Sequence, residues 1–112
     1  MALFKRTFVR GDTLVGLYAI LQDGAGAPVN LEGQEVYLYM ESTVDGFVKV
    51  NGKGVHVLDA LAGRVVYYWD AEDVNTLGGF WTWFVRTHEG KRSTHPVGDK
   101  LLVTFVDGPL DT

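Results

Sequence analysis

The feature that most constrains the fold is the alternation of apolar and polar residues in short stretches separated by glycine-rich turns. No window of the sequence keeps apolar residues at helical spacing through three turns. Alternation with period two is typical of strands whose two faces meet different surroundings. The 14 glycines fall mostly between the stretches, where a strand has to stop. The sequence therefore predicts an all-β fold.

Seven or eight strands are expected, over residues 3–9, 13–22, 34–42, 47–50, 55–59, 64–70, 80–88 and 100–106. Tight turns are predicted at Asp45-Gly46 and at Asn51-Gly52, because these dipeptides tolerate the positive φ angles of hairpin turns. A capping aspartate and early acidic residues favour one short helical turn near 71–75. Short strands at regular spacing predict an antiparallel β-sandwich.

The 112 residues suit a single domain over 1–112. The chain has no cysteine, so it contains no disulfide and no thiolate metal ligand. Its net charge is −4, from 10 basic and 14 acidic residues, and the basic ones stand singly or in pairs such as Lys5-Arg6. A nucleic-acid-binding protein usually carries a basic stripe instead, so we expect no nucleic-acid partner.

No apolar run reaches the ~20 residues of a membrane-spanning helix, so no membrane association is expected. The opening segment 1–6 has no apolar core after its charges and does not read as a secretory signal. We therefore expect a protein that is made and kept in the cytoplasm until another component moves it.

Catalytic chemistry is not expected. His56, His88 and His95 lack metal-ligand spacing. His88 and His95 flank the turn at 89–92 and could approach each other, but a place in surface loops is the preferred interpretation. The acidic pair Glu72-Asp73 is expected to be solvated, which leaves no desolvated pocket to tune a general acid. The prediction is a protein that is not an enzyme and has no catalytic, metal or cofactor-binding residue.

An ordered series of turn and strand motifs runs from residue 11 to about residue 106. It comprises Gly11-Asp12-Thr13; Asp23 with Gly26 and Pro28-Val29; Leu31-Glu32-Gly33-Gln34-Glu35-Val36-Tyr37-Leu38; Asn51-Gly52-Lys53-Gly54-Val55; Gly63-Arg64-Val65-Val66-Tyr67; Ala71-Glu72-Asp73; and Gly79-Phe80-Trp81. This series resembles the immunoglobulin-like N-terminal domain of phage baseplate upper proteins. The resemblance implies an immunoglobulin-like sandwich in a virion component that docks, often in repeated copies, on other tail or baseplate proteins.

The sequence departs from that family in one respect. In baseplate upper proteins the module is usually the N-terminal part of a longer chain, whereas no coiled coil or receptor-binding domain is expected after residue 106 here. The difference favours an adaptor or a particle decoration over a receptor-binding protein.

The same resemblance implies that Trp81, Trp83 and Val85 face the core. Alternation then sends Phe80 and Phe84 outward.

By the same rule the outward residues of the other strands include Tyr37, Tyr39 and Tyr68. The predicted interface residues are Tyr37, Tyr39, Tyr68, Phe80 and Phe84. Exposed aromatic surface of this extent is typical of an interface with a partner. Two alternatives remain: another segment covers this face, or the strand register is shifted by one, which would exchange two faces that are both aromatic.

The leading hypothesis is a structural component of a tailed phage particle, a tail or baseplate adaptor located in the virion. Its partners would be other virion proteins, with multiple copies or a homo-oligomer in the particle. A capsid decoration protein is an alternative. A carbohydrate-binding module is another, because exposed tyrosine and tryptophan rings on a sheet can stack on sugars.

Overall fold

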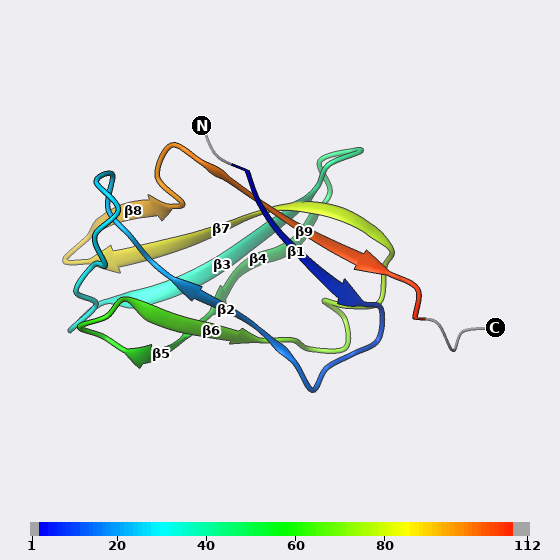
Figure 1. The fold of residues 1–112 in the computed structure, drawn as a ribbon, viewed down its shortest axis with the longest axis horizontal. Helices are drawn as coiled ribbons and strands as arrows, with labels where there is room; N and C mark the ends of the chain where they lie inside the picture. Colours follow the sequence, from blue (N-terminus) through cyan, green and yellow to red (C-terminus); the bar gives the residue numbers. More distant parts are fainter. Residues whose placement is uncertain (1–2, 109–112) are drawn as a thin grey trace.

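The computed structural model describes residues 3–108. They form nine strands in two facing sheets, and no helix occurs among them (Figure 1). The strands are β1 Leu3–Val9, β2 Gly16–Ile20, β3 Glu35–Ser42, β4 Val48–Gly54, β5 His56–Asp59, β6 Arg64–Tyr68, β7 Gly78–His88, β8 Lys91–His95 and β9 Lys100–Val106. The predicted all-β sandwich is confirmed. Residues 3–108 accordingly offer no helix with the length and apolar character to span a membrane.

The two sheets differ in size. The large sheet has the order β1-β9-β7-β3-β4, and the small sheet has the order β2-β6-β5. One side of β7 pairs with β3, and its other side pairs first with β9 over Gly78–Thr82 and then with β8 over Phe84–His88. All pairs are antiparallel except β1 with β9. This order corresponds to strands B-E-D and C-F-G of an immunoglobulin-like sandwich.

Two turn predictions differ from the structure. Asn51-Gly52 lies inside β4, where the pairing with β3 shifts register and Gly52 has φ of 74°. The dipeptide therefore makes a bulge instead of ending the strand. Residues 71–75 form a hydrogen-bonded turn and not a helix. The Asp73 side chain holds this turn by accepting a hydrogen bond from the Asp70 N–H at 2.9 Å.

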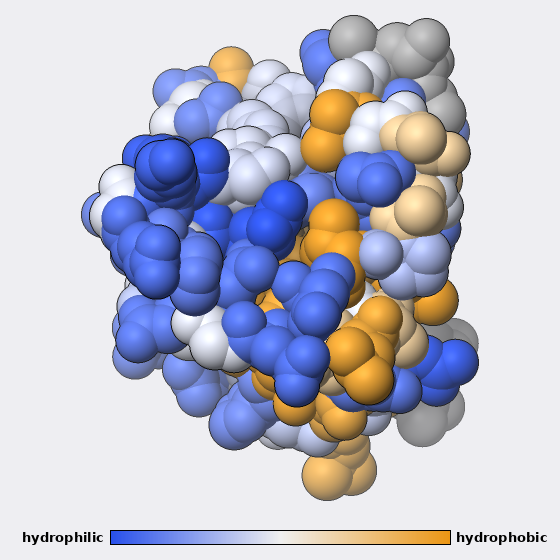
Figure 2. Space-filling model, turned by 90° about the vertical axis from the view of Figure 1, so that its left-hand side faces the viewer, coloured by the Kyte–Doolittle hydropathy of each residue, from blue (hydrophilic) through white to orange (hydrophobic). Residues whose placement is uncertain are grey.

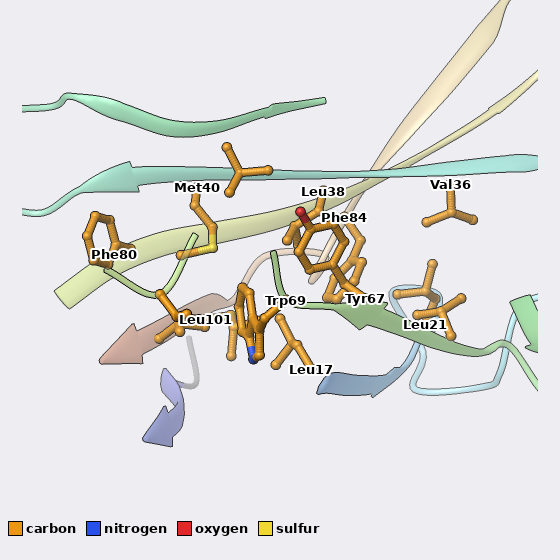
Figure 3. Packing of buried hydrophobic residues seen from close by; sticks show 14 of the residues in the cluster. Leu17, Leu21, Val36, Leu38, Met40, Tyr67, Trp69, Phe80, Phe84 and Leu101 are labelled. Atoms are coloured by element: carbon orange, nitrogen blue, oxygen red, sulfur yellow. The ribbon is translucent and has the colours of Figure 1, made fainter. Parts of the chain in front are cut away.

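The core lies between the sheets (Figure 3). Leu38 and Met40 of β3 face Leu17 and Tyr67 from the small sheet, as the alternation predicts. Trp69 follows β6 and packs edge-on against three aromatic rings at centroid distances of 5.2 to 5.4 Å. These rings belong to Phe8, Tyr67 and Phe105.

A buried carboxylate ties the two sheets together where β6 turns into β7. Asp73 is 1% exposed and accepts a hydrogen bond from the Tyr67 hydroxyl at 2.7 Å. The Lys53 ammonium of β4 lies 3.1 Å from the same carboxylate. Burial, with the hydrogen bond and charge of Asp73, raises the pKa of Tyr67. Burial alone would lower the pKa of Lys53, but Asp73 and then Asp70 outweigh it and raise that pKa.

Asp73→Ala is expected to lower the free energy of unfolding by about 3–5 kcal/mol, because it leaves the buried hydrogen-bond donors and the Lys53 charge without their partner. Asp70→Ala is the matched control: its exposed carboxylate lies 3.5 Å from the same lysine, and its loss should cost under about 1 kcal/mol. Urea denaturation of both variants measures the difference. Equal losses would show that the buried position of Asp73 is unimportant.

Candidate interaction surface

Four aromatic side chains stand together on the outer face of the large sheet. Tyr37 and Tyr39 come from β3, and Trp81 and Trp83 come from the adjacent β7. Tyr39 lies directly opposite Trp83 in the pairing of these strands. All four are half-buried, so each ring shows part of its surface to solvent. We call these four residues the aromatic face.

The predicted outward orientation of Phe80 and Phe84 is wrong. Both are core residues, 3% and 1% exposed, and both lie between the sheets in Figure 3. The Phe80 ring packs 5.9 Å from that of Phe105. The register of β7 is therefore shifted by one from the prediction, so that Trp81 and Trp83 take the outward positions.

The family resemblance implied the wrong register, and the end of β7 offers no pattern that would have corrected it. Arg86 has the same inward parity as Phe84. Its guanidinium forms hydrogen bonds there with the side chains of His95 and Gln34. Val85 has the outward parity and is nevertheless only 4% exposed. A charged inward residue and a buried outward one make the alternation misleading. The available signal was the tryptophans, whose indole N–H favours a partly solvated position.

Tyr68 is exposed as predicted, but it lies on the other sheet. It is 50% exposed at the end of β6, and its ring contacts that of His56 at 5.2 Å. Tyr68 thus belongs to the small sheet, whereas Tyr37 and Tyr39 belong to the large sheet. The three tyrosines do not form one surface.

The backbone and a nearby cation hold the aromatic face in place. Gly52 lies under the Tyr39 ring, where an added Cβ would come within 2.9 Å of the Tyr39 hydroxyl oxygen. The Lys100 ammonium sits 4.9 Å from the centroid of the Trp81 ring, a cation–π contact. The Tyr37 hydroxyl donates to the Glu35 carboxylate. This bond, and then the charge of Glu35, raise the pKa of Tyr37.

A hollow of about 300 Å³ opens on the aromatic face between β4, β3, β7 and β8. Its apolar lining comes from Tyr39, Met40, Val48, Trp83 and Val85. Polar side chains also line it: Glu41, Asn51, Arg92 and Thr94. The combination of rings with hydrogen-bonding groups suits a partner that is partly apolar and partly polar.

A second hollow lies at one side of the sandwich, between β1, β2 and the connection from β8 to β9. It has a volume of about 300 Å³ and a floor of core side chains, among them Leu17, Phe84 and Leu101. We call it the edge cleft. The end of the molecule that carries β8 is mostly hydrophilic on one side, whereas hydrophobic residues lie among hydrophilic ones on the other (Figure 2).

His95 lines the edge cleft and is buried, in contrast to its predicted place in a surface loop. It is 2% exposed in β8. Its Nδ1 lies 2.9 Å from the Gln22 carbonyl oxygen, and its Nε2 accepts a hydrogen bond from Arg86 Nε at 3.0 Å. These partners assign the proton to Nδ1 and a neutral ring. Arg86 also donates to Gln34 Oε1 at 2.9 Å, which links the loop before β3 to β7.

The three histidines do not gather. His88 lies at the far end of the β7–β8 hairpin from His95, with Nδ1 3.2 Å from the Gly33 carbonyl oxygen. His56 is on the small sheet. Within residues 3–108, no group of three histidine, aspartate or glutamate side chains is arranged to hold a metal ion.

Phe84→Asp is expected to unfold the protein, with a loss of unfolding free energy above about 4 kcal/mol, because it buries an unpaired charge in the core. Trp83→Ser removes a neighbouring aromatic ring from the outer face and should cost only about 1–2 kcal/mol. Thermal melts followed by circular dichroism compare the two. A folded Phe84→Asp variant would contradict the β7 register.

Stability is expected to depend on the ionisation of His95. Burial, aided by the Arg86 charge, lowers the pKa of His95, although the bond to Gln22 opposes the shift. The folded state therefore binds the proton less readily than the unfolded state, whose imidazole titrates near about 6.5. The contribution of the neutral His95 ring to the free energy of unfolding is therefore complete above that pH. It is lost as the pH falls below that value toward the pKa of His95 in the folded state.

Urea denaturation between about pH 7.5 and pH 5.5 should show this loss in the natural protein and a flatter profile in His95→Gln. The exposed His56 is the matched control, and His56→Gln should keep the full pH dependence. A His95→Gln profile as steep as that of the natural protein would exclude His95 as the source.

No protein-family model matches the chain, and no curated protein matches it by sequence. Among solved structures, the fold is similar to that of the N-terminal domain of phage TP901-1 ORF48. The TM-score is 0.58 at 15% sequence identity, over 94% of this chain and 98% of that chain. At this identity the likeness establishes a shared fold across nearly the full length of both chains.

Proposed function

We propose that this chain is a structural, non-enzymatic component of a tailed bacteriophage particle and serves as a tail or baseplate adaptor. Two likenesses support a phage role. The order of its turn motifs resembles the N-terminal domain of baseplate upper proteins. Its fold is similar to a domain of a phage protein over nearly all of both chains.

The observation that carries the proposed mode of action is the aromatic face. Tyrosine and tryptophan are enriched in the buried centres of protein interfaces, where they contribute most of the binding energy. Here Tyr39 and Trp83 line a hollow to which polar side chains also contribute. An apolar centre with a polar rim is the usual arrangement of a stable interface.

The mechanism is passive. A rigid sandwich presents the aromatic face to a neighbouring virion protein, and the symmetry of the particle sets the number of copies. The protein assembles in the host cytoplasm and resides in the virion. Its partners are other virion proteins, and neither nucleic acid nor a membrane takes part.

Immunogold labelling tests the location. An antibody raised against the purified chain should label the tail tip of intact particles in electron micrographs. Label spread over the head would assign the chain to capsid decoration instead. Particles that carry no label, while the protein is plainly expressed, would contradict a structural role.

The same assay tests the aromatic face. Trp83→Ser should remove the label from the particles because it deletes a central ring, whereas the folded variant accumulates free. Tyr68→Ser removes a half-exposed ring from the small sheet and should leave labelling unchanged. Equal labelling of both variants would show that the interface lies outside the aromatic face.

A carbohydrate-binding module is the second candidate, supported by the composition of the hollow. Trp83 and Tyr39 offer rings, and Asn51, Glu41 and Arg92 offer hydrogen bonds to hydroxyl groups. A thermal-shift assay with polysaccharides separates the two candidates. A stabilisation that Trp83→Ser abolishes would favour sugar binding, and none is expected for an adaptor.

A further inference from the structure

The three asparagines of the chain differ in how their side chains are held. Asn30 accepts a hydrogen bond from the Glu32 N–H at 2.9 Å and donates to the Glu32 carboxylate at 3.2 Å. Asn75 accepts hydrogen bonds from the Lys49 ammonium and the Thr76 hydroxyl. The Asn51 side chain has no such partner within residues 3–108, and Asn51 is exposed. Its amide is therefore the untethered one of the three.

The backbone next to Asn51 is irregular. In the pairing of β4 with β3, Tyr39 lies opposite Asn51 and Leu38 lies opposite Lys53. Gly52 is thus the extra residue of the bulge, which leaves it without a partner in the ladder. Within residues 3–108, β4 is also the last strand at its end of the large sheet, so no further strand covers its other side. Gly52 has no Cβ that could shield its nitrogen.

An untethered asparagine before a glycine of this kind can react within its own chain. The Gly52 backbone nitrogen loses its proton to solvent and attacks the Asn51 Cγ. The bond from Cγ to the side-chain nitrogen breaks, that nitrogen takes up a proton and leaves as ammonia, and a five-membered succinimide remains. Water then opens either imide carbonyl and yields aspartate or its β-linked isomer. Because both reacting groups belong to adjacent residues, no bimolecular encounter is needed.

We propose that Asn51 is a site of spontaneous deamidation, which replaces an amide of the aromatic face by a carboxylate. The overall reaction consumes one water and releases one ammonia, without a redox step or a cofactor. Asparagine is among the thermolabile residues of proteins. Asn30 and Asn75 are protected by their hydrogen bonds, and the residues that follow them, Leu31 and Thr76, both carry a Cβ. The structure therefore favours reaction at Asn51.

The modification acts on the aromatic face in two ways. Asn51 lines the hollow together with Glu41 and Trp83, so the product places a second negative charge in it, and like charges repel. The β-linked product also lengthens the main chain immediately before Gly52, over which the Tyr39 ring lies. Both effects weaken docking through this surface. That consequence rests on the proposed virion role, whereas the chemistry does not.

Ageing of the purified, folded chain at mildly alkaline pH tests the site. Digestion and mass spectrometry should show that the peptide with Asn51 gains the mass of an amide-to-acid conversion, at a rate at least about tenfold above that of Asn30 or Asn75. An isoaspartate methyltransferase should label the β-linked product. Asn51→Gln is the matched control: it keeps an amide, but ring closure would need a six-membered ring, and its peptide should stay unmodified.

The same ageing of the chain unfolded in guanidinium chloride completes the test. If the unfolded chain converts Asn51 while the folded chain keeps it intact, the bulge protects the amide and the proposal is overturned. Conversion of Asn30 or Asn75 at the rate of Asn51 would overturn it as well.

The consequence for docking has a separate readout. Asn51→Asp, which carries the new charge, should reduce immunogold labelling of the particles, and Asn51→Gln should preserve it. Equal labelling of the two variants would overturn the effect on docking. Absence of label for the natural protein would contradict the virion role itself and would leave the mass-spectrometric result standing.

Discussion

The pairing of β3 with β7 is the constraint on which the rest of the structure depends. It runs without interruption from Glu35 opposite Thr87 to Ser42 opposite Phe80. Because side chains alternate along a strand, this register decides which residues enter the core and which form the outer surface of the large sheet. A shift of one position would bring Trp83 inside and expel Phe84. The core and the aromatic face are therefore two consequences of one alignment.

Buried polar groups secure that alignment at both ends of β7. Before the strand, the Asp73 carboxylate joins Tyr67 of the small sheet to Lys53 of the large one. Toward its other end, Arg86 and His95 connect the large sheet to the loops that enter β3. Buried networks of this kind make alternative packings costly, since any displaced partner leaves an unsatisfied group. Hydrophobic contacts between the sheets supply compactness, and these two networks supply the specific arrangement.

The sequence predicts the fold well where the two faces of a strand differ in polarity. In β3, the inward Leu38 and Met40 alternate with residues that can face water, and the prediction is confirmed. In β7, both parities are aromatic, so the pattern contains no information about direction. Strand β8 is polar throughout, and alternation could not reveal it. In the aromatic face, the outward orientation of Tyr37 and Tyr39 was accordingly predicted and that of the two tryptophans was missed.

The position of the Tyr39 ring over Gly52 has a consequence for the energetics of association. A free aromatic side chain loses rotational freedom when a partner immobilises it, and this loss opposes binding. Here the backbone of β4 already confines the ring, and Trp81 is similarly restrained beneath the Lys100 ammonium. These two side chains therefore lose much of their rotational freedom when the chain folds, before any partner binds. The surface is pre-organised, so contacts made on it translate into affinity with a smaller entropic penalty.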